Sequence, residues 1–304
     1  MKENMYDNFS KLEKRVLDSI EKSDLIKLRD ILSSINEPTL VSGVGGSYVV
    51  SEFISKVLSQ KNNIICNNVE SRSLKYKNLN NYKNIISCSY SGNNLGVDLS
   101  FDNNLNKYLL SKNKREGVTN INYVVDEVEH SFISLSSTLI PMTMLLLYYS
   151  NNDTDLIKEI LSSKIDFNIN NKLIYEILSG YETSTAHTFL ESTLVESGIG
   201  SPVVHDKYDY CHGRSTLNYH HNNNIIFFNT ESELDKLFES ELNKYYENVI
   251  KIDRKYDDEI INDYYLTYLS MLLTKEIASI QNKDLSNVNY SGIVKKLYRY
   301  KGEV

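Results

Sequence analysis

The sequence predicts an α/β protein with two successive units, each a parallel sheet flanked by helices. After Pro38, short apolar runs alternate with polar or helical stretches, which is the pattern of buried parallel strands joined by helices. The second half of the chain repeats the order of the first: strand, small-residue turn, helix, strand, polar turn. We therefore expect a helical segment over residues 1–36, a first unit over 37–165 and a second unit over 166–304.

The spacing of apolar residues predicts the elements of the N-terminal segment and the first unit. Between Phe9 and Ile35 they recur every three or four positions, as on a helix with one buried face. Short apolar runs predict strands at residues 39–44, 63–66, 84–89 and 120–125. Helices are predicted at residues 49–58, 135–149 and 155–161. The polar stretch 164–171 is the expected connection to the second unit.

The second unit is expected to begin with a buried strand and to end with a long helix. Strands are predicted at residues 173–178, 224–228 and 248–252. Helices are predicted at residues 184–197, 231–245 and 257–281. In the last helix, Ile260, Tyr264 and Tyr268 share one face, so this face is expected to be buried.

The charge distribution argues against nucleic acid as a partner. The chain has 33 basic and 40 acidic residues, a formal net charge of −7, and neither sign forms a long block. A surface that binds nucleic acid would show clustered Lys and Arg. We therefore expect no nucleic-acid partner.

The cysteines and the apolar runs predict a cytoplasmic protein. Cys66, Cys88 and Cys211 are far apart and form no CxxC pair, which fits free thiols in a reducing compartment. The N-terminus is charged and amphipathic rather than an apolar secretory signal. The longest apolar run, 139–149, is shorter than the ~20 residues that cross a bilayer, so no membrane partner is expected.

The first candidate binding segment follows the strand predicted at residues 39–44. Gly45, Gly46 and Ser47 lead from this strand into a helix. Glycines let the backbone approach a ligand, the free N–H groups of a helix start attract an anion, and Ser47 adds a hydroxyl donor. The lysine and the glycine spacing of the common nucleotide-binding loops are absent, so neither ATP nor NAD is expected. A glycine-rich turn without a ligand is the alternative.

The second candidate binding segment follows the strand predicted at residues 84–89. Ser89, Ser91 and Asn94 place polar side chains just before a possible helix. Open parallel sheets bind ligands at the carboxyl ends of their strands, where the strand order reverses, so the two loops are expected to form one crevice. Ordinary turn chemistry is the alternative for each loop taken singly.

These two loops resemble the signature of the sugar isomerase (SIS) family. This family includes the isomerase domain of glucosamine-6-phosphate synthase and the bifunctional phosphoglucose/phosphomannose isomerases. Its first loop is glycine-rich and ends in Ser, as at Ser47, and its second reads S-x-S-G-x-T, matched by Ser89, Ser91 and Gly92 with Asn94 in place of Thr. The resemblance implies two SIS-type, flavodoxin-like subdomains with three αβα layers, and a sugar phosphate held by the loop hydroxyls.

The second half of the chain resembles the catalytic part of the same family. Residues 189–196 are similar to the family helix that ends in the catalytic glutamate, and residues 209–213 are similar to its acidic-x-x-His-Gly segment. Glu196 and His212 are 212 − 196 = 16 positions apart, as in both named subfamilies. The resemblance implies that Glu196 is the base and that His212 reaches the site from a partner subunit.

Aldose–ketose interconversion explains why these two residue types suit the reaction. A base must move a proton between C1 and C2 through a cis-enediol, and a carboxylate suits this task if burial raises its pKa. A second group must open the sugar ring, and an imidazole accepts and donates protons near neutral pH.

The closing segment adds a lysine, and two positions depart from the family pattern. Lys295 falls at the active-site lysine of the phosphoglucose/phosphomannose isomerase branch, with Lys296 next to it. Residues 134–144 contain no counterpart of the active-site arginine of that branch. Thr193 stands where the synthase branch carries a lysine. The substrate is therefore expected to differ from those of both branches.

These observations predict an aldose–ketose isomerase that acts on a hexose 6-phosphate, without a cofactor, as a homodimer or higher homo-oligomer. A non-catalytic sensor of a sugar phosphate and a phosphosugar lyase or deglycase are the alternatives. No metal is expected, because the spacing of the cysteine and histidines near His212 matches no zinc pattern.

Overall fold

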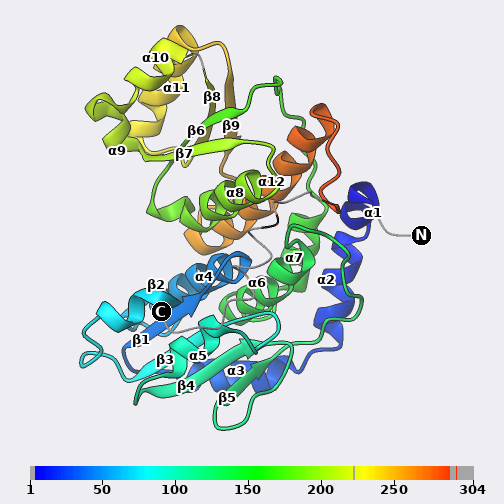
Figure 1. The fold of residues 1–304 in the computed structure, drawn as a ribbon, viewed down its shortest axis with the longest axis vertical. Helices are drawn as coiled ribbons and strands as arrows, with labels where there is room; N and C mark the ends of the chain where they lie inside the picture. Colours follow the sequence, from blue (N-terminus) through cyan, green and yellow to red (C-terminus); the bar gives the residue numbers. More distant parts are fainter. Residues whose placement is uncertain (1–3, 222, 288–291, 293–304) are drawn as a thin grey trace. The chain divides into compact units, whose positions relative to one another are not determined.

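The computed structural model describes residues 4–221, 223–287 and 292. The chain forms two compact units that divide between Asp155 and Leu156, and the second unit extends to Leu285 (Figure 1). Within the described ranges, no helix is both long enough and apolar enough to cross a membrane.

The first unit contains a five-stranded sheet in the order β2-β1-β3-β4-β5. Its strands are β1 (Thr39–Gly43), β2 (Cys66–Glu70), β3 (Asn84–Cys88), β4 (Asn106–Ser111) and β5 (Thr119–Asn122). Every pairing is parallel. The strand order reverses between β1 and β3, and both of these strands are buried along their whole length.

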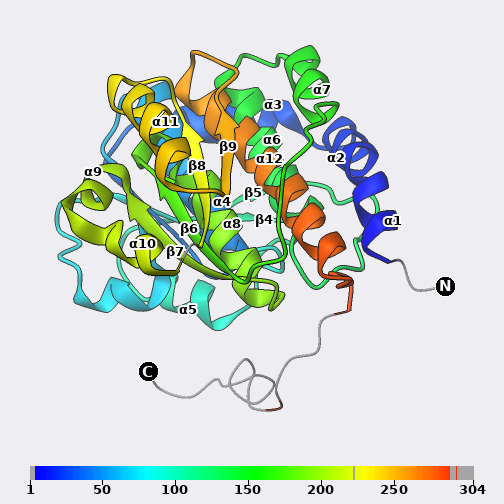
Figure 2. The ribbon, with the colours of Figure 1, turned by 90° about the horizontal axis from the view of Figure 1, so that it is seen from above.

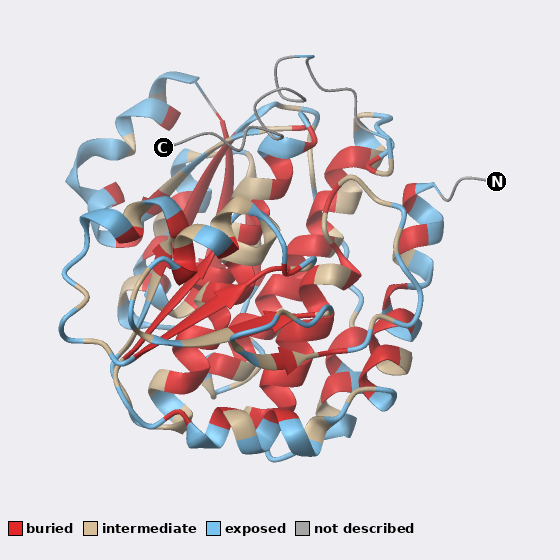
Figure 3. Ribbon diagram, turned by 60° about the horizontal axis from the view of Figure 1, so that its bottom comes forward, coloured by how far each residue is buried: buried red, intermediate tan, exposed pale blue. Residues whose placement is uncertain are grey.

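Helices cover both faces of this sheet. They are α1 (Met5–Ser10), α2 (Leu12–Glu21), α3 (Leu25–Ser34), α4 (Gly46–Lys61), the 3-10 helix η1 (Ser71–Tyr76), α5 (Leu95–Phe101) and α6 (Ser136–Tyr149). On one face, residues of η1 and α5 pack against Leu40, Ile85 and Leu109 of the strands. Elsewhere, α4 contacts β1, β2 and β3, and α6 packs against α4 and α2. Figure 3 shows the buried residues concentrated on the strands and on the inner faces of the helices.

The second unit contains a four-stranded parallel sheet in the order β7-β6-β8-β9. Its strands are β6 (Ile174–Ser179), β7 (Ser201–Asp206), β8 (Asn224–Asn229) and β9 (Val249–Asp253). Its main helices are α7 (Thr154–Leu161), α8 (Ser184–Glu196), α10 (Thr216–His221), α11 (Glu233–Tyr245) and α12 (Glu259–Ile280). α10 and α11 lie on one side of the sheet, and α8 and α12 lie on the other (Figures 1 and 2). The predicted α/β class with two parallel sheets is therefore confirmed.

Three strands differ from the sequence prediction. β2 begins at Cys66, after the apolar pair Ile64–Ile65 that suggested residues 63–66, and β4 and β7 were not predicted. β2 and β7 are edge strands with partly exposed side chains, so they need no continuous apolar run. β7 also contains Pro202, which is tolerated at an edge. β4 has polar residues at both ends and a short apolar centre.

Candidate functional site

Residues 44–47, which comprise the turn after β1 and the first two residues of α4, are shaped by glycine. A Cβ atom on Gly43 would lie 2.2 Å from the carbonyl oxygen of Ser47, so the backbone passes too close for any side chain there. Gly45 has φ 59° and ψ −135°, which only glycine adopts readily. The first turn of α4 has no side-chain cap, and the half-buried Ser47 hydroxyl has no hydrogen-bond partner among the described residues. The N–H groups of Ser47 and Tyr48 donate to the carbonyl oxygens of Val44 and Gly45, at 3.3 and 2.8 Å. This segment, named loop 1, therefore offers the N–H of Gly46 at the helix start and the Ser47 hydroxyl.

The loop between β3 and α5, residues 89–94, is held by its own polar side chains. The buried Ser89 Oγ accepts hydrogen bonds from the backbone N–H of Gly92 and from Asn94 Nδ2, each at 3.1 Å. Asn94 Oδ1 accepts from the N–H of Val97 at 3.0 Å and so caps α5. Asn is among the best N-cap residues, which explains how it replaces the usual Thr. Ser91 is exposed at the outer end of this loop, named loop 2.

The two loops are neighbours at the carboxyl edge of the sheet. β1 pairs with β3, with Ser42 opposite Ser87. A Cβ atom on Gly96 would lie 2.9 Å from Val44 Cγ2, so the first turn of α5 packs directly against loop 1. The structure thus brings Gly45, Gly46 and Ser47 to the same edge as Ser89, Ser91 and Asn94, at the point where the strand order reverses.

The end of β4 and the residues after it also contact loop 2. These contacts were not predicted from the sequence, because β4 itself was not predicted. Ser111 Oγ donates a hydrogen bond to the carbonyl oxygen of Tyr90 at 3.2 Å. Asn113 Nδ2 donates to the carbonyl oxygen of Ser91 at 2.9 Å. Between them, the Lys112 ammonium lies 4.1 Å from the centroid of the Tyr90 ring. A cation therefore stands beside loop 2.

The N-terminus of α6 is occupied by a carboxylate of the chain itself. Glu129 accepts hydrogen bonds from the N–H groups of Leu135, Ser136 and Ser137 at 2.7–3.2 Å and from both serine hydroxyls. An anion at this position favours the helix, because the first N–H groups of a helix lack intrahelical partners. α6 itself contains no charged residue, so the helix in which the resemblance would place an arginine carries no cation.

In the second unit, Glu196 is the last residue of α8 and is exposed. Its Oε1 accepts a hydrogen bond from Ser192 Oγ at 3.0 Å. On the same helix, burial and the neighbouring charge of Glu196 raise the pKa of Glu191. The exposed Glu196 carboxylate is open to a ligand or to another chain.

His212 is also exposed, in the π-helical turn Tyr210–Arg214. Gly213 follows it with φ 101°, a conformation that suits glycine, and the helix kinks at this position. Within the described part of the chain, no hydrogen bond or ion pair joins His212 to Glu196. Lys295 and Lys296 lie outside the described residues.

A buried polar cluster lies behind the His212 turn, and no sequence signal pointed to it. Glu176 and His205, on neighbouring strands β6 and β7, are buried with 3.7 Å between Glu176 Oε2 and His205 Nε2. Asn223 Nδ2 donates to Glu176 Oε1 at 2.8 Å, and the ring of Tyr210 packs against His205 with 5.4 Å between centroids. Burial raises the pKa of Glu176 and lowers the pKa of His205, so both side chains are shifted toward their uncharged forms.

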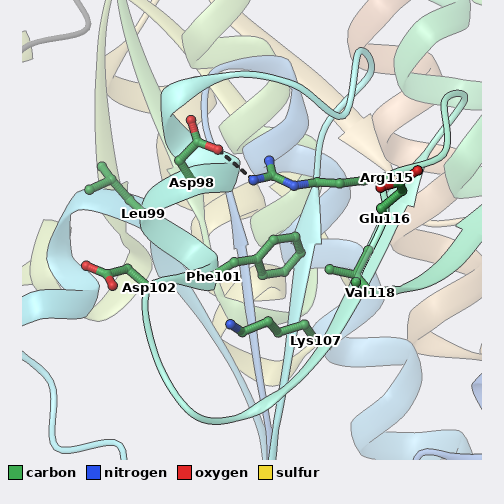
Figure 4. A pocket seen from close by; sticks show the side chains of 9 residues that line it. Asp98, Leu99, Phe101, Asp102, Lys107, Arg115, Glu116 and Val118 are labelled. Atoms are coloured by element: carbon green, nitrogen blue, oxygen red, sulfur yellow. Dashed lines mark hydrogen bonds and ion pairs between the residues drawn. The ribbon is translucent and has the colours of Figure 1, made fainter.

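A separate hollow of about 480 Å³ lies along α5 and residues 115–118 (Figure 4). Arg115 forms an ion pair with Asp98 at 2.8 Å, and its guanidinium lies 5.6 Å from the centroid of the Phe101 ring. The lining includes no residue of loop 1 or loop 2. We assign no role in binding to this hollow.

Comparison with known proteins identifies the fold. No protein-family profile matches the sequence, and no curated protein matches it. The tagatose-6-phosphate ketose/aldose isomerase of Escherichia coli matches with a TM-score of 0.71 at 13% identity, over 94% of this chain and 96% of that one. The chain has the SIS fold. The resemblance drawn from the two loops is thereby confirmed at the level of fold.

Two further SIS-fold structures agree with this result. Glucosamine-6-phosphate deaminase from Thermotoga maritima matches with a TM-score of 0.68 at 16% identity, over 92% of this chain and 98% of that one. The C-terminal domain of glucosamine-fructose-6-phosphate aminotransferase from Francisella tularensis matches with a TM-score of 0.68 at 13% identity, over 94% and 98%. At such identities the likeness is one of fold.

Proposed function

We propose that this protein binds a phosphorylated sugar and interconverts its aldose and ketose forms. One observation carries the proposal: loop 1 and loop 2 adjoin at the carboxyl edge of the first sheet, where its strand order reverses. Sheets of this order bind ligands at that point. The names of the structures with the same fold support the choice of ligand, because they describe proteins of sugar phosphate chemistry.

The phosphate is assigned to the two loops. Ser47 and Ser91 supply hydroxyls, and the backbone at Gly45 and Gly46 supplies N–H groups at the start of α4. Ser89 and Asn94 hold loop 2 through the bonds described above. The Ser89 hydroxyl proton and the second amide proton of Asn94 are left for the substrate.

The proton transfer is assigned to Glu196. In the open-chain aldose, its carboxylate removes the C2 proton, the C–H electrons form a C1–C2 double bond, and the C1 oxygen takes up a proton. Return of a proton to C1, with loss of the C2 hydroxyl proton, leaves the ketose. Electrons and protons balance without a redox partner, so the reaction is an isomerisation of a hexose 6-phosphate through a cis-enediol.

Ring opening is assigned to His212 of a partner subunit, which makes a homodimer or a higher oligomer necessary. The exposure of His212 supports this role, because the side chain is free to enter a neighbouring chain. An imidazole can donate a proton to the ring oxygen and accept one from the hydroxyl near neutral pH. Lys295 is proposed to stabilise the enediolate oxygen.

The cytoplasm is the proposed location. Cys66, Cys88 and Cys211 are free thiols in the structure, which supports a reducing compartment. We propose no nucleic-acid or membrane partner.

The Glu196→Gln variant tests the function. Wild type and variant are screened by thermal shift against fructose, glucose, mannose and glucosamine 6-phosphates and against inorganic phosphate. The sugar that stabilises the protein is then incubated in heavy water and followed by NMR. We expect deuterium at C1 or C2 with wild type and at least a 100-fold slower incorporation with the variant, because removal of a general base costs 10²–10⁴-fold.

Glu21→Gln is the matched control, since Glu21 is also an exposed residue at the end of a helix, α2. It should leave both binding and exchange unchanged. Equal exchange in wild type and Glu196→Gln would refute the assignment of the base. The absence of any stabilising phosphosugar would refute the proposed function as a whole.

A sugar-phosphate sensor is the second candidate. It is favoured by the exposure of Glu196 and by the lack of a cation on α6. The same experiment separates the two functions, because a sensor would be stabilised by a phosphosugar and would catalyse no exchange.

A further inference from the structure

The two proposed phosphate loops contain no charged side chain. Residues 44–47 and 89–94 consist of glycine, serine, asparagine, valine and tyrosine. Hydrogen bonds alone would then hold a phosphate group, which carries ~1.5–2 negative charges at neutral pH. A nearby cation would add an attraction that these loops cannot supply.

Lys112 directly follows β4, the strand that pairs with β3. β3 and β4 pair in register up to Cys88 opposite Leu110, and the N–H of Ser89 donates to the carbonyl oxygen of Leu110 at 3.0 Å. Lys112 follows two residues later, where loop 2 begins on the neighbouring strand. The main chain at Lys112 is therefore fixed beside loop 2 by the sheet itself.

Side-chain contacts on either side of Lys112 strengthen this placement. Ser111 and Asn113 each donate a hydrogen bond to a loop 2 carbonyl oxygen. Gly92 packs so closely against Ser111 that a Cβ atom on this glycine would lie 2.7 Å from Ser111 Oγ. The residues on both sides of Lys112 thus contact loop 2.

The ammonium of Lys112 contacts an aromatic ring, and this contact does not neutralise its positive charge. It lies 4.1 Å from the centroid of the Tyr90 ring, and the side chain is half-buried. An aromatic face attracts a cation without cancelling its charge. Within the described part of the chain, Lys112 forms no ion pair with a carboxylate. This differs from Arg115 nearby, whose charge is paired with Asp98.

We infer that Lys112 is a phosphate-binding residue that selects the dianionic form of the sugar phosphate. Its charge stabilises the dianion more than the monoanion, because Coulomb attraction scales with the charge of the ligand. The inference rests on the proposed function and extends it to the ionisation state of the substrate. Tyr90 orients the ammonium from within loop 2.

The test is the affinity of fructose 6-phosphate, or of the stabilising phosphosugar found above, for wild type, Lys112→Gln and Lys112→Arg. Calorimetric titration at pH 7.5 should show a Kd about tenfold higher for Lys112→Gln and within about threefold of wild type for Lys112→Arg. Between pH 5 and 7.5, wild-type affinity should rise as the phosphate loses its second proton near pH ~6. This rise should be smaller in Lys112→Gln.

Lys114→Gln is the matched control, because Lys114 is exposed two residues further along the same segment. It should bind as tightly as wild type. The unliganded melting temperature of Lys112→Gln should equal that of wild type, which would exclude misfolding as the cause. An equal Kd for wild type and Lys112→Gln would overturn the inference and leave the proposed function standing. Failure of wild type to bind any phosphosugar would overturn both.

Discussion

At the scale of single residues, loop 1 depends on the absence of a side chain at Gly43 as much as on the polar groups that it presents. Gly43 lies at the end of β1, and the backbone of Ser47 passes over its Cα. This close approach turns the chain sharply into α4, whose N-cap residue, Gly45, has no side chain to cap the helix. The geometry for an anion therefore comes from the backbone, and Ser47 adds its hydroxyl.

Gly43→Ala should damage both the fold and the binding loop. A methyl group 2.2 Å from a carbonyl oxygen forces the backbone to move, and such overpacking costs about 1–3 kcal/mol. We expect a lower urea midpoint and at least tenfold weaker phosphosugar binding. Ser47→Ala is the contrast, because it removes only the hydroxyl. It should weaken binding with an unchanged midpoint, and a large loss of stability in Ser47→Ala would contradict this division of roles.

At the scale of elements, the turn that carries His212 lies on a buried polar cluster. Tyr210 begins the π-helical turn, and its ring packs against His205 and Phe238. Glu176 lies beneath it on the central strand β6. Buried polar groups with partial hydrogen bonding are costly, so a cluster of this kind points to a constraint on the turn above it. Tyr210 fixes the start of the turn on this cluster, two residues before His212.

Glu176→Gln should stabilise the protein at neutral pH and not at low pH. Burial raises the pKa of Glu176 above its usual value of 4.5. A group with a raised pKa in the folded state contributes stability below the unfolded pKa and loses it as the pH rises through the folded pKa. Gln cannot ionise and still accepts the Asn223 hydrogen bond. Urea unfolding should be measured between pH 4 and 8. The midpoint of the variant should exceed that of the wild type, and this difference should appear only above about pH 4.5.

A lower midpoint for Glu176→Gln at pH 7 would contradict this prediction. It would mean that an ionised Glu176 is paired with a protonated His205. Glu239→Gln serves as the control, because Glu239 is an exposed glutamate of α11 in the same unit. Its exposed ion pair with Lys251 is expected to contribute little.

At the scale of the whole molecule, the proposed catalytic residues predict a site shared between subunits. Glu196 and His212 are both exposed, and each is open to a second copy of the chain. A twofold-symmetric dimer would use each residue in both sites. Sedimentation analysis should therefore show at least a dimer.

A complementation experiment tests the shared site directly. Glu196→Gln and His212→Asn should each be inactive alone. After mixing and subunit exchange, half of the dimers contain one of each chain, and each of these has one site with both residues intact. About a quarter of wild-type activity should return. If Glu196 and His212 came from the same chain, mixing would restore nothing.

Local residue patterns were enough to predict the fold class, the central strands and the two loops. β1, β3, β6 and β8 are buried on both faces, so each must be an apolar run and is visible as such. The loops after β1 and β3 are visible because a sharp turn and an N-cap require glycine, serine or asparagine. The SIS resemblance rested on these loops and on the segments that contain Glu196 and His212.

The contacts between these elements could not be predicted from local residue patterns, because they form only when the chain folds. β2 and β7 lie at sheet edges, where partial exposure removes the apolar signal. Lys112 gains its proposed role from the contact with Tyr90. Tyr90 lies 22 residues earlier in the chain and comes beside Lys112 because β3 and β4 pair. Glu176 and His205 likewise meet through strand register. Such contacts join segments that are far apart in the sequence. They depend on how the strands pair and pack, so a local sequence pattern cannot predict them.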